Sequence, residues 1–222
     1  MVAKKLIDNS VANSRVKSED ERVSKLEIDP KTGFHLKDKE WTPEQDMAVI
    51  NPGYKNFKQN TKNNCSHCVT AYELRRRGYD VRATLSTRGE TLLDMLKVFP
   101  KAKHRILYKP IKSVVTNNED GTKNVRLATI HESQKYDVLE FNLLKHGDGA
   151  RGNLLVTWAS LGGHCIAWEN QKGKVILRDC QSNKTYSDRK DVEKLLKNTI
   201  IADYYRTDNV DFNVKKAKEY VQ

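Results

Sequence analysis

Three residue types that together perform nucleophilic amide chemistry occur in order along the sequence, as Cys65, His164 and Asp179. Cys65 follows a polar stretch and begins an amphipathic pattern. This predicts a cysteine in the first turn of a helix, where the partial positive charge favours the thiolate. His164 begins an apolar stretch behind Gly162 and Gly163, and Asp179 ends the next one. A thiolate, an imidazole base and a carboxylate that orients the imidazole can together attack a carbonyl or carboxamide.

Such an attack also needs hydrogen-bond donors for the oxyanion that develops on the substrate. The backbone N–H of Cys65 is one candidate, because the first N–H groups of a helix have no acceptor within the helix. A side-chain amide from the preceding loop is the second, and that loop offers Gln59, Asn60, Asn63 and Asn64.

The distance between His164 and Asp179 depends on the turn that joins their strands. The turn lies within Asn170-Gln171-Lys172-Gly173. With Gln171-Lys172 as a two-residue loop, His164 lies directly opposite Asp179. A bulge at Gly173 would shift this pairing by one position. The sequence therefore predicts a cross-strand His–Asp pair whose register depends on the turn.

The remaining cysteines and histidines lack such a setting. Four cysteines in 222 residues are too few for a disulfide scaffold, so we expect reduced thiols. Cys68 is expected to pack on the same helix face as Cys65, and His67 is expected to be exposed. A zinc module remains an alternative, although only one CxxC pair is present and no metal is expected. Its ligands would be drawn from Cys65, Cys68, His164, Cys165 and Cys180.

The pattern of elements predicts helices first and a sheet afterwards, which is typical of an α+β domain. Helices are expected from Pro43 to the stop at Asn51-Pro52-Gly53, and from Cys65 to a C-cap at Gly78. Further helices are expected over 91–99, 136–145 and 191–198. Strands are expected over 104–116, 123–130, 154–159, 164–169, 174–179 and 200–206.

The charge indicates how the chain is organised. The net charge is +11, and residues 1–60 carry 11 basic and 10 acidic groups, so the surplus belongs to the body. Residues 1–40 are rich in charge and poor in apolar residues, which predicts an extended arm before a catalytic domain over 41–222. The run Arg75-Arg76-Arg77 is expected to be solvated at a helix end. A pI near 9.4 favours non-specific contact with nucleic acid, although no nucleic-acid motif supports it.

The segment from Asn51 to Tyr54 and the segment from Asn64 to Val81 resemble the papain-fold toxin family, whose domains occur in bacterial polymorphic toxins and phage minor head proteins. The resemblance covers roughly residues 50–182. It implies a papain-like fold in which a cysteine on the first helix faces a histidine and an aspartate on an antiparallel sheet. The segments that carry it are NPGY, NCSHCVTAYELRRRGYDV, the Gly-His pair at 163–164 and the segment RDCQ at 178–181.

The resemblance implies Cys65 as nucleophile, His164 as base and Asp179 as orienting carboxylate. Gln59 would donate to the oxyanion, and Asn64 and Gln181 would position substrate. The implied activity is cofactor-free hydrolysis of protein amides, either glutamine deamidation or peptide cleavage.

The absence of an export module makes the chain similar to phage components, in a virion or the host cytoplasm, with residues 1–40 docking onto a capsid or portal. The alternative is a virion structural or interaction protein that keeps the fold. No signal peptide or membrane span is expected, and no membrane partner.

Overall fold

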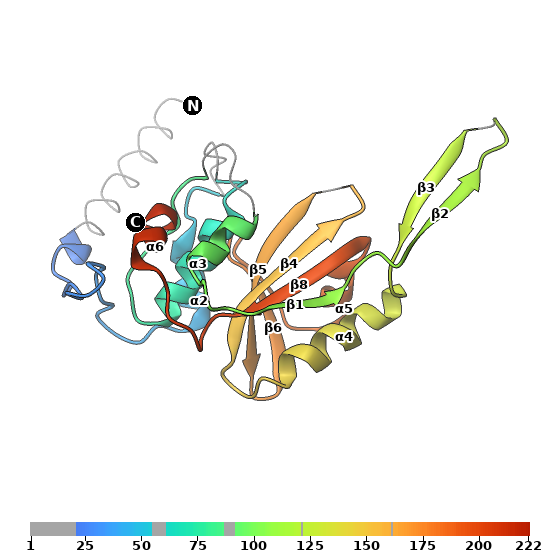
Figure 1. Cartoon of the computed structure of the whole chain (residues 1–222). Helices are drawn as coiled ribbons and strands as arrows, with labels where there is room; N and C mark the ends of the chain where they lie inside the picture. The colour runs from blue at the N-terminus through green and yellow to red at the C-terminus, as the bar shows by residue number, and fades with distance from the viewer. Residues whose placement is uncertain (1–20, 55–60, 87–91, 121, 161) are drawn as a thin grey trace, which may run out of the picture.

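The computed structural model describes residues 21–54, 61–86, 92–120, 122–160 and 162–222 (Figure 1). Its helices and strands, in chain order, are α2 (Pro43–Ile50), α3 (Cys65–Arg76), the 3-10 helix η1 (Leu92–Lys97), β1 (His104–Tyr108), β2 (Lys112–Asn117), β3 (Lys123–Ala128), α4 (Glu132–Leu144), β4 (Arg151–Trp158), β5 (Gly163–Gln171), β6 (Lys174–Asp179), β7 (Lys184–Tyr186), α5 (Arg189–Leu196), β8 (Thr199–Arg206) and α6 (Val214–Tyr220).

Six strands form one antiparallel sheet in the order β1-β8-β4-β5-β6-β7, and β2 and β3 pair with each other in a separate hairpin. The mixed α+β class predicted from the sequence is confirmed. Helix α3 contacts β5, near the middle of the sheet, and α2 packs against α3. Helix α3 is thus placed against the strand that carries His164.

Alternating side chains of the central strands build two apolar cores on opposite faces of the sheet. On β4, Leu155 packs with α2, α3 and α6, whereas Leu154 and Val156 pack with α4 and α5. This is the period of two that a strand buried on both faces must show. The sheet is therefore covered by helices on both faces, and α3 lies on the face that carries Cys165 and Ala167.

The chain around Pro110 differs from the sequence prediction. One strand was expected over 104–116, but β1 ends at Tyr108 and joins the main sheet beside β8, while β2 begins at Lys112 and pairs only with β3. Pro110 explains the break, because proline has no N–H to donate to a strand ladder. In Figure 1 the resulting hairpin stands away from the rest of the molecule.

Both predicted boundaries of α3 are confirmed. The helix begins at Cys65 after the N-cap Asn64. It ends just before Gly78, whose φ of 98° is in the left-handed region that glycine adopts without a steric penalty. Helix α2 also begins as predicted, since the Thr42 side chain accepts a hydrogen bond from the backbone N–H of Gln45.

Part of the predicted arm contacts the body. Phe34 is buried and packs against Tyr79 and Phe212, and Arg22 forms an ion pair with Asp80. These contacts tie residues 21–40 to the body, whereas residues 1–20 lie outside the described ranges. Separability of the arm therefore stays a prediction. Within the described ranges, no helix has the length and apolar character needed to cross a membrane.

Candidate active site

Cys65 is the first residue of α3, and its side chain is almost fully buried. The preceding residue, Asn64, does not cap the helix with its side chain. Its amide instead donates to the backbone O of Thr84 at 3.1 Å and accepts from Asn51 and Gln181 at 3.3 and 3.4 Å. The Asn64 side chain therefore ties three segments together. The side chain of an N-cap residue usually accepts a hydrogen bond from the first N–H groups of its helix, and the Asn64 side chain does not.

His164 connects Cys65 and Asp179. Its Nε2 lies 3.2 Å from Oδ1 of Asp179, and Cys65 is the second side chain that interacts with the imidazole and raises its pKa. Burial disfavours a charge on this ring, but the interactions with Asp179 and Cys65 outweigh it and raise the pKa of His164 to about 10. The indole of Trp158 stacks beside the imidazole, with ring centroids 6.4 Å apart. The ring is thus held as a cation between a carboxylate and a sulfur.

Asp179 is fixed by the turn that follows β6. Its carboxylate accepts hydrogen bonds from the backbone N–H groups of Gln181 and Ser182, at 3.1 and 3.2 Å, and from the Ser182 hydroxyl at 2.6 Å. Burial opposes ionisation, but the hydrogen bond from His164 and those from Ser182 lower the pKa of Asp179 below its ordinary value. The carboxylate is therefore charged and oriented before any substrate arrives.

The predicted register of the β5–β6 hairpin is wrong by two positions. The two-residue loop is Lys172-Gly173, with Gln171 paired to Lys174 and Ala167 to Arg178. Both loop residues have positive φ, 52° and 78°, as a type I′ turn requires, and glycine favours the second position. Asp179 therefore lies one residue beyond the last paired position.

His164 and Asp179 still meet despite this offset. His164 lies in the part of β5 that extends past the last β6 pair, so a diagonal contact replaces the direct one.

Two of the three predicted positioning residues lie in the described ranges. Gln181 lies beside Asn64 through the 3.4 Å contact between their side chains, and its backbone O accepts from Asn51. Gln59 lies outside the described residues. A pocket of about 210 Å³ opens next to this group of amides. Its lining residues are Ala48, Asn51, Pro52, Tyr54, Gln181, Ser182 and Asn183.

The other three cysteines are buried in the core next to Cys65. All four are free thiols. Burial raises the pKa of Cys68, Cys165 and Cys180 well above the ordinary value of a thiol. Cys165 contacts the sulfur of Met95 at 3.4 Å, so it packs as an apolar residue. In the described part of the chain, no three His, Cys, Asp or Glu side chains are grouped as metal ligands.

His67 is fully buried, contrary to the expected exposure. Its Nδ1 lies 2.7 Å from the Thr84 hydroxyl, and its ring packs against Tyr220 of α6 at a centroid distance of 4.5 Å. The cause is the docking of α6, which the sequence did not predict. Thr84 thus bonds both His67 and, through its backbone O, Asn64 at the start of α3.

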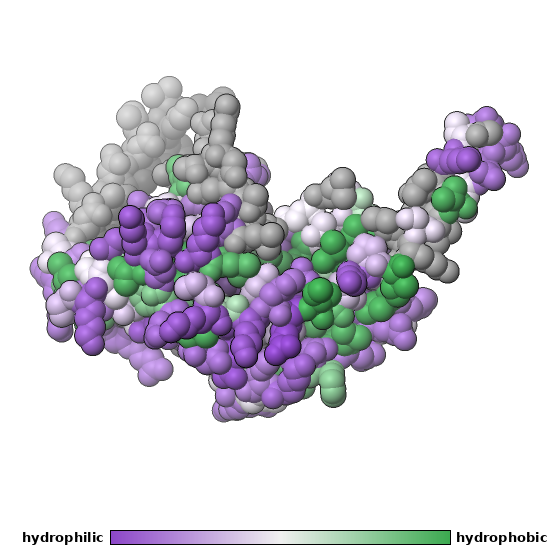
Figure 2. All heavy atoms as spheres, viewed as in Figure 1, coloured by the Kyte–Doolittle hydropathy of each residue, from purple (hydrophilic) through white to green (hydrophobic). Residues whose placement is uncertain are grey.

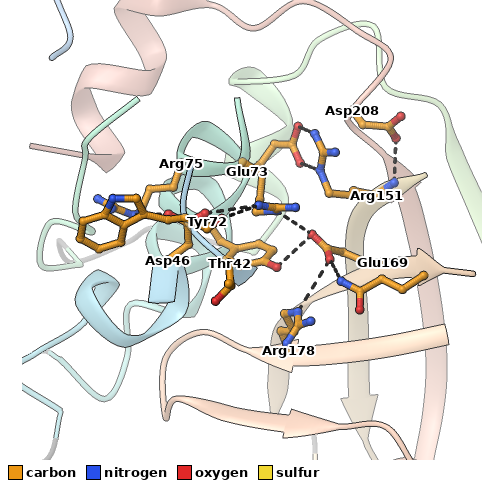
Figure 3. Close-up of polar contacts among 12 residues, drawn as sticks. Thr42, Asp46, Tyr72, Glu73, Arg75, Arg151, Glu169, Arg178 and Asp208 are labelled. Carbon is orange, nitrogen blue, oxygen red and sulfur yellow. Dashed lines mark hydrogen bonds and ion pairs between the residues drawn. The ribbon is translucent and has the colours of Figure 1, made fainter. Parts of the chain in front are cut away.

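The C-terminal half of α3 is held by buried ion pairs (Figure 3). Tyr72 and Arg76 both donate to Glu169 of β5, at 2.9 and 3.1 Å, and Arg75 donates to Asp46 of α2 at 3.0 Å. The prediction that the arginine run is solvated is wrong for Arg75, which is fully buried. Its carboxylate partners come from other segments and supply the compensation that a buried cation needs.

The same network extends to β4 through Glu73. The Glu73 carboxylate pairs with Arg77 at 2.8 Å and with Arg151 at 3.3 Å, and the backbone N–H of Arg151 donates to Asp208 at 2.9 Å. Ion pairs thereby connect α3 to β4 as well as to β5. The ionic network is distant from Cys65, because it occupies the opposite end of a 12-residue helix.

The structure brings together the predicted Cys65, His164 and Asp179, with Asn64 and Gln181 next to them. It adds Asn51, Thr84, Trp158 and Ser182, which sequence reasoning did not assign to the site. Asn51 carried the one available signal, because it opens the Asn-Pro-Gly-Tyr stretch, which was interpreted as a helix stop and as part of the family resemblance but not as part of the site. Backbone-directed bonds such as that of Asn64 to Thr84 leave no pattern in the sequence.

Two comparisons with known proteins complete this description. No curated protein matches the chain. The family model described as papain fold toxin 1, glutamine deamidase, matches residues 63–184, which include Cys65, His164 and Asp179. The matched region is more than half of the 222 residues and runs from the start of α3 to the start of β7. The chain therefore belongs to the papain fold toxin 1 family of glutamine deamidases.

Proposed function

We propose that this protein is a cysteine-dependent amidohydrolase that deamidates glutamine side chains of protein substrates. Cys65 is the nucleophile, His164 the general base and acid, and Asp179 the orienting carboxylate. The single observation that carries this is the His164 imidazole, which lies 3.2 Å from Asp179 and whose pKa is raised by its interactions with Asp179 and Cys65. Membership in a glutamine deamidase family supports the choice of substrate.

In the first half of the reaction, the Cys65 sulfur, having given its proton to His164, attacks the carboxamide carbon. A C–S bond forms and the carbonyl electrons move to oxygen. Collapse of this intermediate breaks the C–N bond, and the His164 imidazolium supplies the proton with which the nitrogen leaves as ammonia. The product is a thioester between Cys65 and the former glutamine side chain.

In the second half, neutral His164 takes a proton from water, and the hydroxide attacks the thioester carbon. The C–S bond breaks, the sulfur recovers a proton from His164, and glutamate is released. Asp179 stabilises the imidazolium in both halves and fixes its orientation. No cofactor is needed to balance either half.

The oxyanion is stabilised in this proposal by backbone N–H groups at the start of α3. The N–H of Cys65 points along the helix axis toward its N-terminal end, as helix geometry requires, and the Asn64 side chain does not occupy this end. Gln59 as the second donor stays a prediction. Asn64 and Gln181 are positioning residues in this proposal, because their side-chain amides form hydrogen bonds that hold the loops around Cys65 in place.

Incubation of the full chain with a glutamine-containing peptide, followed by mass spectrometry, tests the proposal. Conversion of glutamine to glutamate should appear with the wild type and disappear with Cys65→Ala. Cys68→Ala is the matched control, because it removes a thiol three residues further along α3 and should leave conversion intact. A new peptide terminus instead of glutamate would replace deamidation with peptide cleavage. Equal conversion by Cys65→Ala would contradict the assignment of the nucleophile.

Carriage of this activity by a phage particle, with residues 1–40 docking onto a capsid or portal, stays a prediction from resemblance. So does the alternative of a virion protein that keeps the fold without activity. The Cys65→Ala comparison separates these two, since a structural protein would convert no glutamine at all.

A further inference from the structure

The β2–β3 hairpin projects from the sheet, and none of its described residues belongs to either apolar core. Its six strand pairs run from Lys112 opposite Ala128 to Asn117 opposite Lys123, and among the described strands β2 and β3 pair only with each other. At its base the Thr129 hydroxyl donates to the backbone O of Lys109 at 3.1 Å. Figure 1 shows it extending away from the sheet.

The hairpin arises at the same end of the sheet as His164. Tyr108, the last residue of β1, pairs with Ala202, which pairs with Val156, which pairs with His164. These four residues form one row across four neighbouring strands. Three strand spacings correspond to about 14 Å, so a protein bound at the base of the hairpin lies within reach of the candidate site.

The surface of β1 and the hairpin combines apolar and basic side chains. Ile106 is 53% exposed, Ile111 70% and Val115 54%. Residues 101–128 carry seven Lys and Arg against two Asp and Glu, and the two acidic residues, Glu119 and Asp120, lie together at the tip. The exposed cations that the structure describes here are Lys101, Lys103, Arg105, Lys109 and Lys123.

Three of these cations have no ion-pair partner among the residues that the structure describes. None of the ion pairs found among the described residues includes Lys103, Arg105 or Lys109, whereas their neighbour His104 pairs with Asp203. Figure 2 shows hydrophobic side chains toward the base of the projecting hairpin and hydrophilic ones at its tip. Exposed apolar side chains next to cations without an ion-pair partner in the described residues do not stabilise a monomer. Such a surface is typical of a site that binds another molecule.

We infer that β1 and the β2–β3 hairpin form a docking surface for an acidic folded protein, which is the substrate whose glutamine is deamidated. The identification of the docked protein as the substrate rests on the proposed function, whereas the docking itself does not. Unpaired cations complement acidic side chains, and the exposed isoleucines and Val115 supply the apolar centre that protein interfaces have. Nucleic acid fits this surface less well, because protein surfaces that bind a phosphate backbone are more polar than protein–protein interfaces.

The test is photocrosslinking from the hairpin in the inactive full chain. In the Cys65→Ala variant, Val115 is replaced by p-benzoylphenylalanine, and the protein is irradiated in the nuclease-treated soluble fraction of a bacterial lysate. Mass spectrometry identifies the adducts. We expect adducts with proteins more acidic than the lysate average. The Lys103→Glu/Arg105→Glu/Lys109→Glu variant should lower their yield by about tenfold, the lower end of what charge steering produces.

A matched control separates the position of the charges from the net charge. Lys25→Glu/Lys39→Glu/Lys215→Glu makes the same change in charge at three exposed lysines outside β1 and the hairpin, and should leave the yield unchanged. An unchanged thermal unfolding midpoint in both triple variants shows that they fold.

Equal yields from the two triple variants, no adducts, or adducts no more acidic than the lysate would overturn the inference. Crosslinking only to a labelled DNA duplex added in a parallel sample would assign the surface to nucleic acid instead. The identified partners are then incubated with active wild type and scanned for glutamate at former glutamines. Acidic adducts that gain no glutamate would leave the docking surface standing and overturn the claim that the docked protein is the substrate, whereas the peptide assay decides the deamidase proposal.

Discussion

The two ends of α3 are built from different kinds of interaction. At the C-terminal end, Glu73, Arg75 and Arg76 form largely buried ion pairs with side chains of other elements, namely Arg151, Asp46 and Glu169. At the N-terminal end, the described residues near Cys65 include the amides of Asn64 and Gln181, and His164 and Asp179 form an ion pair there. The network at one end fixes the helix to the sheet. The N-terminal end can therefore lack a side-chain cap. In a helix held only by local contacts, the loss of such a cap would lower the stability by about 1 kcal/mol.

This comparison separates stability from chemistry along one helix. Changes at the N-terminal end should lower turnover and leave folding nearly intact, and changes at the C-terminal end should do the reverse.

The largest effect is expected at His164. His164→Ala removes the base and the acid, so turnover should fall by at least about a thousandfold, as in comparable nucleophile–base groups. Assay of ammonia release at saturating substrate measures this. His131→Ala, at an exposed histidine before α4, is the control and should retain full turnover. A loss of less than about tenfold would show that Cys65 does not depend on this imidazole.

The next effect is expected in stability at the opposite end. Glu169→Ala leaves the buried groups of Tyr72 and Arg76 without their acceptor, which should lower the free energy of unfolding by about 3 kcal/mol. Urea unfolding measures the loss. Asp137→Ala, in an exposed ion pair with Arg189, should change little. Turnover of the folded Glu169→Ala protein should stay within a few-fold of wild type, and a large loss there would erase the distinction between the two ends.

A smaller effect on turnover is expected at Asp179. Asp179→Asn keeps a hydrogen-bonding group but removes the charge that stabilises the imidazolium, so turnover should fall on the order of a hundredfold. The double variant with His164→Ala should be no slower than His164→Ala alone, because groups that act as a unit are not additive. Additive losses would show that Asp179 acts separately. Full turnover would direct attention to Gln181.

The smallest effect is expected in how stability depends on pH. The folded pKa of His164 is raised to about 10 from an ordinary 6.5, so its contribution is complete below about pH 6.5 and is lost as the pH rises through 10. The folded pKa of Asp179 is lowered, so its contribution is present above the ordinary value and is lost as the pH falls through the folded one. Urea unfolding of wild type and His164→Ala should therefore converge toward high pH. A constant difference up to pH 10 would contradict the ion pair.

Sequence reasoning placed Cys65 and Asp179 in the secondary structure better than it placed the segments around them. Cys65 at a helix start and Asp179 at a strand end follow from local patterns, and both positions are confirmed. The predicted β5–β6 register was wrong because the loops Gln171-Lys172 and Lys172-Gly173, which differ by one position and shift the register by two, looked equally polar, and the φ angles of Lys172 and Gly173 decide between them. The papain-like class followed from motif resemblance.

The remaining failures have a common physical cause in long-range contacts. Arg75 looked like a solvated helix-end cation because Asp46, its partner at 3.0 Å, lies 29 residues earlier in the chain. His67 looked exposed because α6, which covers it, was not predicted. The hairpin of β2 and β3 was predicted as a pair, but the break at Pro110 that frees it from the main sheet was not. Local periodicity does not report which distant segment will cover a face.

The proposed chemistry depends above all on the protonation state of His164, because the N-terminal end of α3 should hold an imidazolium beside a sulfur and a carboxylate. Nitrogen chemical shifts of the His164 ring, followed by NMR across pH in the full chain and assigned by comparison with His164→Ala, report both ring nitrogens. We expect both nitrogens to be protonated at neutral pH and the ring to titrate with a pKa of about 10. A ring that is neutral at pH 8 and titrates near 6.5 would contradict this expectation.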